Sequence, residues 1–153
     1  MTDREFALLM TEVADRAYLT TIGEDGYPRT RAMLNLRNPS LYPKQMELFA
    51  PHRKDLLVYM SSSPESAKAR QIARNQRGCV YYCHPTRWLG VSLIGDLEVS
   101  RDPGLRRALW NDGWEIYYPK GIDDPWYAVI TLHPRRVEGW TSEGRFEFAD
   151  EGA

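Results

Sequence analysis

The segment YMSSSPESAKAR, residues 59–70, gathers hydroxyl groups and a positive charge where an apolar run gives way to a helical pattern. The pattern predicts a helix from Pro64 to about Asn75, because Ser63 is a favourable N-cap residue and proline suits the first helical position. A helix N-terminus offers unpaired N–H groups and the positive end of the helix dipole, and both attract anions. Four serines add hydroxyl donors, and Lys68 adds a charge. The segment predicts a seat for a phosphate-like anion; the alternative is a capped helix with a solvated Lys68.

Two cysteines and a neighbouring histidine are the other residues that could bind a metal. On a strand, Cys79 and Cys83 would face the same side about 13 Å apart. That separation is too large for a disulfide. His84 would face the opposite side, and the spacing is not the short C-x2-C of zinc sites. We therefore expect no metal site and no disulfide here.

The sequence lacks the motifs of catalytic triads, P-loops, dinucleotide-binding turns and zinc proteases. None of the three histidines lies in a pattern that would make it the base of a triad. A hydrolase is therefore poorly supported, and the sequence predicts no catalytic residue of its own.

Composition indicates one globular domain over residues 1–153. The 20 basic and 21 acidic residues give a net charge of -1, which argues against nucleic acid or an anionic membrane as a partner. No apolar run approaches the roughly 18 residues of a membrane span. The first ten residues also lack the pattern of a signal peptide. We therefore expect a soluble, cytoplasmic protein.

Hydrophobic periodicity and turn signals predict about seven strands and two or three helices. Thr2 and Glu5 form a capping box for the first helix, and Asp102 followed by Pro103 begins a late one. Short turns between strands favour a mainly antiparallel sheet, and a small closed β-barrel with peripheral helices fits this order best. Nine segments have strand character, the last of them short, and they cover residues 17–22, 27–36, 45–51, 55–61, 78–84, 88–100, 126–134, 135–140 and 145–148.

The expected strand 27–36 alternates in character. One face would carry core residues, namely Thr30, Ala32, Leu34 and Leu36. The other face would carry Arg29, Arg31, Met33 and Asn35. The second face presents two arginines, which a plain solvent face could also explain.

Five segments taken in order resemble the FMN-binding split barrels related to pyridoxamine 5'-phosphate oxidase, and especially the small general stress protein branch. The resemblance covers about residues 6–140, and the order and spacing of the segments make it strong. The segments are YLTTIGEDGYPRTRAM, DLLVYMSSSPESAKARQIARN, VSLIGDLEVSRD, LW at 109–110 and YYPKGIDDPWYAVITLHPRRVEGW.

The resemblance implies a mainly β (α+β) fold, an antiparallel split β-barrel with peripheral helices, and FMN as the cofactor. It places the FMN phosphate on Arg31, Ser66 and Lys68. It also implies a homodimer with FMN at the subunit interface, approached by Trp140 of the second subunit. The remaining positions implied near the cofactor are Ala32 and Met33, beside the flavin ring, and Tyr59, Met60 and Ser61, on the strand beneath it.

Three departures from the family pattern bear on the reaction. The oxidases carry an Arg-Leu-His segment after the late tryptophan, whereas this chain reads WTSEGRFEF without a histidine. Gly90 stands where the oxidases place a polar flavin contact. Oxidation of vitamin B6 is therefore not expected. Tyr117 and Tyr118 replace the Trp-Phe pair usual in the stress-protein branch.

The resemblance implies a flavin-dependent oxidoreductase that acts on an unidentified small substrate, with a nicotinamide nucleotide as a candidate reductant. A non-enzymatic flavin-binding protein for stress response or sensing is the first alternative. A relative that binds deazaflavin or haem is the second, and a barrel that has lost its ligand is the third. The same phosphate residues would serve several of these functions, so the sequence leaves them open.

Overall fold

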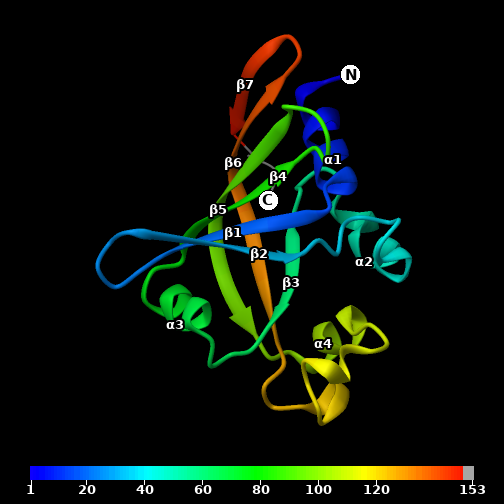
Figure 1. Cartoon of the computed structure of the whole chain (residues 1–153), viewed down its shortest axis with the longest axis vertical. Helices are drawn as coiled ribbons and strands as arrows, with labels where there is room; N and C mark the ends of the chain where they lie inside the picture. The colour runs from blue at the N-terminus through cyan, green and yellow to red at the C-terminus, as the bar shows by residue number, and fades with distance from the viewer. Residues whose placement is uncertain (150–153) are drawn as a thin grey trace.

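The computed structural model describes residues 1–149, and these residues build one seven-stranded antiparallel sheet (Figure 1). Neighbouring strands follow the order β2-β1-β4-β5-β6-β3, and β7 pairs with β6. The strands are β1 (Arg16–Ile22), β2 (Pro28–Leu34), β3 (Val58–Ser62), β4 (Arg77–Cys83), β5 (Gly90–Ser100), β6 (Ala128–Thr141) and β7 (Gly144–Ala149). The predicted antiparallel order is confirmed.

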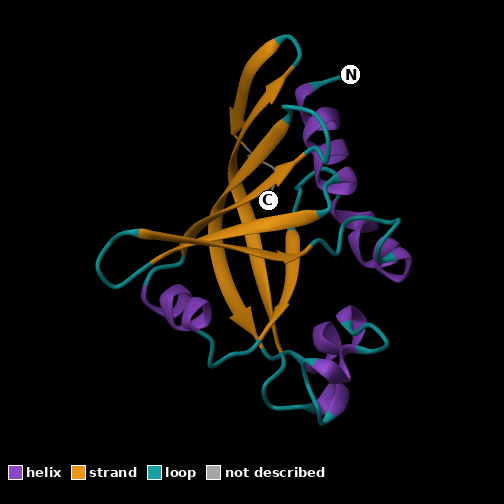
Figure 2. Cartoon of the chain, viewed as in Figure 1, coloured by secondary structure: helices purple, strands orange, loops and turns teal. Residues whose placement is uncertain are grey.

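Helices lie around the curled sheet and none passes through it (Figure 2). The α-helices are α1 (Asp3–Val13), α2 (Met46–Phe49), α3 (Ala67–Arg74) and α4 (Pro103–Leu109). Short 3-10 turns are η1 (Pro43–Gln45), η2 (Ala50–His52), η3 (Trp114–Ile116) and η4 (Gly121–Asp123). No helix in the described part of the chain is long and apolar enough to cross a membrane.

Hydrogen bonds do not close the barrel. The strand order ends at β2 on one side and at β3 on the other, and these two edges are not paired with each other among the described residues. The predicted split barrel is therefore confirmed, whereas the fully closed barrel is not. The split between β2 and β3 is the feature on which the site below depends.

Two helix starts follow the caps predicted from the sequence. Thr2 and Glu5 form the reciprocal capping box of α1. Asp102 caps α4, where its Oδ2 accepts a hydrogen bond from the backbone N–H of Leu105 at 2.9 Å. Both motifs satisfy backbone donors that the helix itself leaves unpaired.

The late segments predicted as two strands form the single strand β6. The register between β5 and β6 shifts at Ile94/Gly95, and Pro134 lies opposite Gly95. Proline cannot donate to the ladder, and a bulge is one of the few places in a sheet where it is tolerated. A side chain at position 95 would place its Cβ 2.0 Å from the carbonyl oxygen of His133, so glycine is required there.

The strand predicted over residues 45–51 is wrong. The segment forms α2 between the two turns η1 and η2. Gln45 and Phe49 are both buried, four residues apart, which is the spacing of one helix face. Gln45 Nε2 donates to the carbonyl oxygen of Leu109 at 2.7 Å, so a partner distant in the sequence stabilises the helical form.

Two apolar clusters fill the interior. The first lies between α1 and the inner face of the sheet, and the second lies beside β6 at the α4 end of the molecule. Aromatic side chains dominate the second cluster, where Trp110 and Tyr127 have ring centroids 5.4 Å apart. Such pairs contribute about 0.5–1.5 kcal/mol beyond their burial. The buried members of the second cluster are Leu36, Phe49, Leu109, Trp110, Trp114, Tyr118, Tyr127 and Val129.

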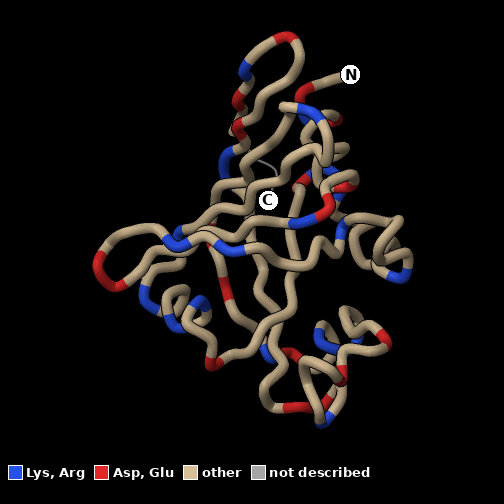
Figure 3. The backbone as a smooth tube through the Cα atoms, in the orientation of Figure 1, with Lys and Arg blue, Asp and Glu red and all other residues tan. Residues whose placement is uncertain are grey.

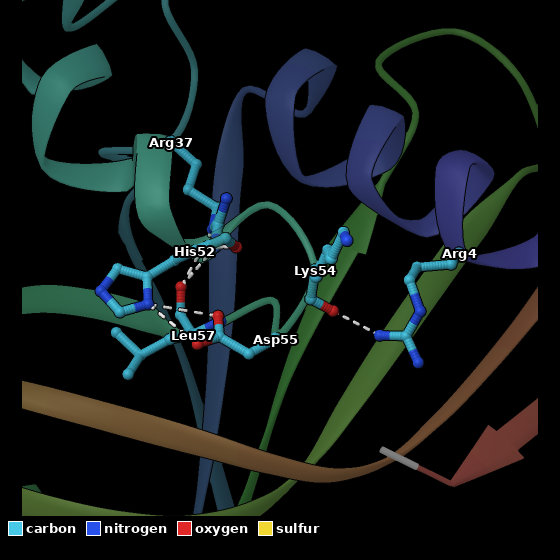
Figure 4. A network of polar contacts seen from close by, with 6 residues as sticks. All are labelled: Arg4, Arg37, His52, Lys54, Asp55 and Leu57. Atoms are coloured by element: carbon cyan, nitrogen blue, oxygen red, sulfur yellow. Dashed lines mark hydrogen bonds and ion pairs between the residues drawn. The ribbon is translucent and has the colours of Figure 1, made fainter. Parts of the chain in front are cut away.

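The buried Arg37 ties the chain after β2 to the chain that enters β3 (Figure 4). Its Nη2 donates to the carbonyl oxygens of His52 and Leu57, at 2.8 and 2.6 Å. Leu56, next to this anchor, has a positive φ of 56°. Such a conformation costs a non-glycine residue about 1–3 kcal/mol and persists only where neighbouring contacts enforce it. The Arg37 bonds therefore help to fix where β3 begins relative to β2.

Candidate functional site

The split between β2 and β3 opens into a groove of about 760 Å³. This volume lies within the range of about 300–1,000 Å³ typical of small-molecule sites. We call it the split groove. Its lining residues come from β1, β2, β3, α3 and two segments outside the sheet: Asp15, Arg16, Ala32, Met33, Leu34, Asn35, Leu41, Tyr42, Ser61, Ser62, Ser63, Lys68, Tyr117 and Tyr118.

Residues 61–68, which we call the serine-rich corner, form one end of this groove. The helix that follows, α3, begins three residues later than predicted. Ser66, not Ser63, is the N-cap of α3, and its Oγ accepts a hydrogen bond from the N–H of Ala69 at 3.2 Å. Ser63 instead closes a turn before the helix, where its Oγ accepts from the N–H of Glu65 at 3.2 Å. Both serines suit an N-cap, and the earlier one is used for the turn.

Two cations meet at this corner. Lys68 lines the groove from the first turn of α3, and Arg31 extends from β2 toward the same helix. Arg31 donates from Nη1 to Thr21 Oγ1 at 2.8 Å and from Nη2 to Gln71 Oε1 at 3.2 Å. Because Gln71 lies on α3, these bonds hold the guanidinium against the helix. Figure 3 shows basic positions gathered on α3 and on the neighbouring β1–β2 hairpin.

The electrostatics of the corner reflect this crowding. Burial lowers the pKa of the Lys68 ammonium, and the positive charge of Arg31 lowers it further. Burial likewise lowers the pKa of the Arg31 guanidinium, with a contribution from Arg29. Arginine nevertheless stays charged at any ordinary pH. The corner thus concentrates positive charge in a partly desolvated place, which favours an anionic ligand.

The face assigned to β2 in the sequence analysis is reversed over residues 30–33, whereas Leu34 and Leu36 pack in the second core cluster as expected. Arg31 and Met33 lie opposite Leu19 and Ala17 of β1, so they share the inner face with buried residues. Thr30 and Ala32, which were expected in the core, are exposed. The physical reason is that β2 is an edge strand, so its inner face borders the groove and α3, and an arginine there does not enter the core.

Hydroxyl groups continue along the groove from the corner. Ser62 Oγ lies 3.3 Å from Ser66 Oγ. Burial raises the pKa of the Tyr118 phenol, and a hydrogen bond with the Ser61 side chain opposes that rise. Ser61 is thus held by an aromatic residue whose ring packs in the second core cluster.

The structure brings together four of the residues that the sequence predicted for the cofactor, since Ala32, Met33, Ser61 and Lys68 all line the split groove. Arg31 and Ser66 lie beside them at the corner.

The other three predicted residues neither line the groove nor lie at its serine-rich corner. Tyr59 packs in the aromatic cluster, 5.8 Å from Phe49 between ring centroids. Met60 is buried in the first core cluster. Trp140 lies on the outer face of β6 and is 56 % exposed. Their roles stay predictions, and the role of Trp140 depends on a second subunit.

Sequence reasoning missed Leu41 and Tyr42, which come from the proline-punctuated loop after β2 and form one wall of the groove. Tyr117 and Tyr118 line the groove as well. An aromatic residue in a loop was the only signal available, and it did not indicate which surface the ring would face.

A second groove of about 600 Å³ runs along α1, beside the loop of residues 84–89 and the turn before β7. It contains none of the residues predicted for the cofactor. It also lacks the paired cations of the serine-rich corner, so the split groove is the better candidate site.

Comparison with known proteins agrees with this fold. A family model described as pyridoxamine 5'-phosphate oxidase like matches residues 10–151. The chain belongs to this family. No curated protein matches it in sequence. The resemblance to the pyridoxamine 5'-phosphate oxidase-like split barrels is thereby confirmed.

Solved structures of family members and neighbours share the fold. A Clostridium acetobutylicum protein related to general stress protein 26 has a TM-score of 0.74 and 25 % identity, over 97 % of this chain and 96 % of its own. General stress protein 26 from Bacillus anthracis has a TM-score of 0.72 and 16 % identity, over 97 % of this chain and 99 % of its own. A heme binding protein from Mycobacterium smegmatis has a TM-score of 0.71 and 17 % identity, over 99 % of this chain and 59 % of its own.

Proposed function

We propose that this protein binds FMN in the split groove and acts as a flavin-dependent oxidoreductase on a small substrate. The observation that carries the proposal is the position of two cations at the start of α3: Lys68 lines the split groove, and Arg31 lies beside it, bonded to Gln71 of the same helix. A phosphate monoester carries a charge of about −1.5 to −2 at neutral pH and would neutralise this pair.

Besides its positive charge, the serine-rich corner offers hydrogen-bond donors for a phosphate. A guanidinium has five N–H donors. The contacts of Arg31 with Thr21 and Gln71 leave donors of Nε and Nη2 for a ligand. Lys68 adds a point charge, and the first turn of α3 adds backbone N–H groups. Arg31, Lys68 and Ser66 would therefore hold the phosphate group.

The middle of the groove suits the flavin ring. Met33 and Ala32 line it from β2, and Ser61 lines it from the end of β3. The bound flavin would supply the redox chemistry, and the protein would supply binding, orientation and electrostatics. This division of labour agrees with a sequence in which no catalytic acid or base was found.

We also propose a homodimer with the cofactor site at the subunit interface. Trp140 lies opposite Gly90 on the outer face of the sheet, and Tyr81 on the same face is 39 % exposed. Exposed aromatic side chains on a sheet face are typical of protein interfaces. A second subunit on this face would bury them, and Trp140 is the residue that we assign to the partner's flavin.

Haem is the other ligand suggested by a structural neighbour. All three histidines lie in the described residues, and none lines the split groove. His52 and His133 each contact a carboxylate, and His84 lies in the loop after β4. The cation pair suits a phosphate better than it suits a porphyrin, so we favour a flavin. A deazaflavin and a non-enzymatic flavin role fit the same residues and are decided by experiment.

The decisive experiment is the visible absorption spectrum of the purified protein, with the released chromophore identified by mass. We expect a flavin spectrum and the mass of FMN. Titration of the ligand-free protein with riboflavin, which lacks the phosphate, is the matched control, and we expect it to bind at least tenfold more weakly. Equal affinity for FMN and riboflavin would contradict the assignment of the serine-rich corner to the phosphate group. Rapid bleaching by a reduced nicotinamide nucleotide without oxygen would support the enzyme, and no bleaching would favour the non-enzymatic alternative.

A further inference from the structure

The two ends of the split groove differ in charge. The phosphate end contains Lys68 with Arg31 beside it, a formal charge of two positive units. The opposite end lies around Leu34, about 10 Å further along β2 at the usual rise per residue. We call it the tyrosine end, and its lining residues are Leu34, Leu41, Tyr42 and Tyr117. The charged side chains there are Asp15 and Arg16, which cancel formally.

The tyrosine end presents apolar surface to solvent. Leu41 is 52 % exposed and Tyr117 is 55 % exposed, although both line the groove. Tyr117 is supported from behind by Tyr118, with ring centroids 6.4 Å apart at an angle of 66°. Tyr118 itself is buried in the second core cluster. The exposed ring therefore rests on a rigid base and is available for stacking.

Two phenols approach each other across this end from segments distant in the sequence. Tyr42 and Tyr117 both line the groove, burial raises the pKa of the Tyr42 phenol, and the neighbouring Tyr117 raises it further. The Tyr42 phenol, whose pKa is raised, stays protonated at neutral pH and can donate a hydrogen bond. An aromatic face next to hydroxyl donors suits a flat molecule that carries an acceptor oxygen.

We propose that the tyrosine end binds the substrate, and that the substrate is a planar, uncharged aromatic molecule with a hydrogen-bond acceptor such as a carbonyl. The inference rests on the proposed function, because it assigns the phosphate end to the cofactor. An anionic molecule would be drawn to Arg31 and Lys68, where the cofactor phosphate would compete with it. A neutral ring gains from Leu41 and Tyr117 without that competition.

Coumarin is a suitable probe because it is planar, uncharged and carries a carbonyl, and because oxidised FMN without a reductant leaves it unchanged. Its affinity for the FMN-loaded protein would be measured by equilibrium dialysis. Tyr117→Ala is expected to weaken coumarin binding at least tenfold, and Tyr117→Phe, which keeps the ring, only a few-fold. Ile116→Ala is the matched control, because Ile116 is 79 % exposed next to Tyr117 and does not line the groove. Coumarin-3-carboxylate, the same ring with one negative charge, is expected to bind at least tenfold more weakly than coumarin.

The outcomes separate this inference from the proposed function. Absence of coumarin binding, unchanged binding by Tyr117→Ala, or equal affinity for the carboxylate would overturn the inference. Loss of FMN from Tyr117→Ala would overturn it too, since the tyrosine would then belong to the cofactor site. Failure of FMN to bind the unaltered protein, measured in its own titration, would overturn the proposed function, whereas Tyr117-dependent coumarin binding would still identify the tyrosine end as a site.

Discussion

Lys68, in the first turn of α3, lies close enough to Arg31 of β2 for the charge of the arginine to lower the pKa of the lysine. Like charges held together in a partly desolvated place destabilise the ligand-free fold. A bound anion turns that repulsion into attraction. The arrangement is therefore costly without a ligand and favourable with one, which is the behaviour expected of a binding site and not of a solvated surface.

Removal of either cation should weaken FMN binding. Each of Arg31→Ala and Lys68→Ala removes a charged hydrogen bond, and we expect a loss of about 1.5–3 kcal/mol. That corresponds to roughly 10- to 150-fold in dissociation constant, measurable by flavin fluorescence quenching. Arg29→Ala is the matched control, because Arg29 lies on the same strand but pairs with Asp25 in solvent. Full flavin occupancy in the Arg31/Lys68 double variant would refute the site.

The lowered pKa of Lys68 predicts a pH dependence with a definite sign. In the folded, ligand-free protein the ammonium holds its proton less tightly than in the unfolded chain, whose ordinary pKa is 10.5. The unfolded state then binds more protons between the two values, so this residue makes stability rise with pH across that window. Urea unfolding from neutral pH up to 10.5 should show this rise, and Lys68→Gln should reduce it. FMN affinity should fall over the same window, because the neutral amine no longer attracts phosphate.

Much of the fold could be predicted from the sequence, because its signals are local. The capping box of Thr2 and Glu5 and the cap at Asp102 formed where they were expected. Period-two alternation and short turns predicted that the strands pair mainly in the antiparallel sense, but not their order in the sheet. Local signals did not link Lys68 to Met33: the family resemblance implied that both lie at the cofactor, and both line the split groove.

The errors come from contacts between distant parts of the chain. The segment 45–51 is helical because Gln45 bonds to the backbone of Leu109, which no local pattern reveals. The face of β2 was reversed because Arg31 reaches Gln71 on α3 from an edge strand. Tyr42 was missed because only the tertiary structure places its loop beside β2.

Two variants of Ser66 should separate its contribution to helix stability from its contribution to phosphate binding. Ser66→Ala removes the bond to the N–H of Ala69 and should cost about 1 kcal/mol of stability. Ser66→Asp should restore the cap, because aspartate is an equally good N-cap residue, although it loses the 2.8 Å bond that Ser66 Oγ donates to the carbonyl oxygen of Ser63. It also places a negative charge where the phosphate would bind, so we expect at least a tenfold loss of FMN affinity. Thermal unfolding and FMN titration of both variants test this, and an aspartate variant that binds FMN normally would contradict the seat.

The assignment of Trp140 to the partner's flavin predicts complementation between two defective chains. In a heterodimer of Arg31→Ala and Trp140→Ala subunits, one site would lose both residues and the other would keep both. Co-expressed, differently tagged chains should therefore bind one FMN per heterodimer with normal affinity, while each homodimer binds weakly. If Trp140 served the site of its own subunit, both sites of the heterodimer would be defective. Trp126→Ala is the control, because Trp126 is 54 % exposed, nearly the same as the 56 % of Trp140, and does not line the split groove. Paired with Arg31→Ala, this control should also leave one normal site, and its homodimer should keep two.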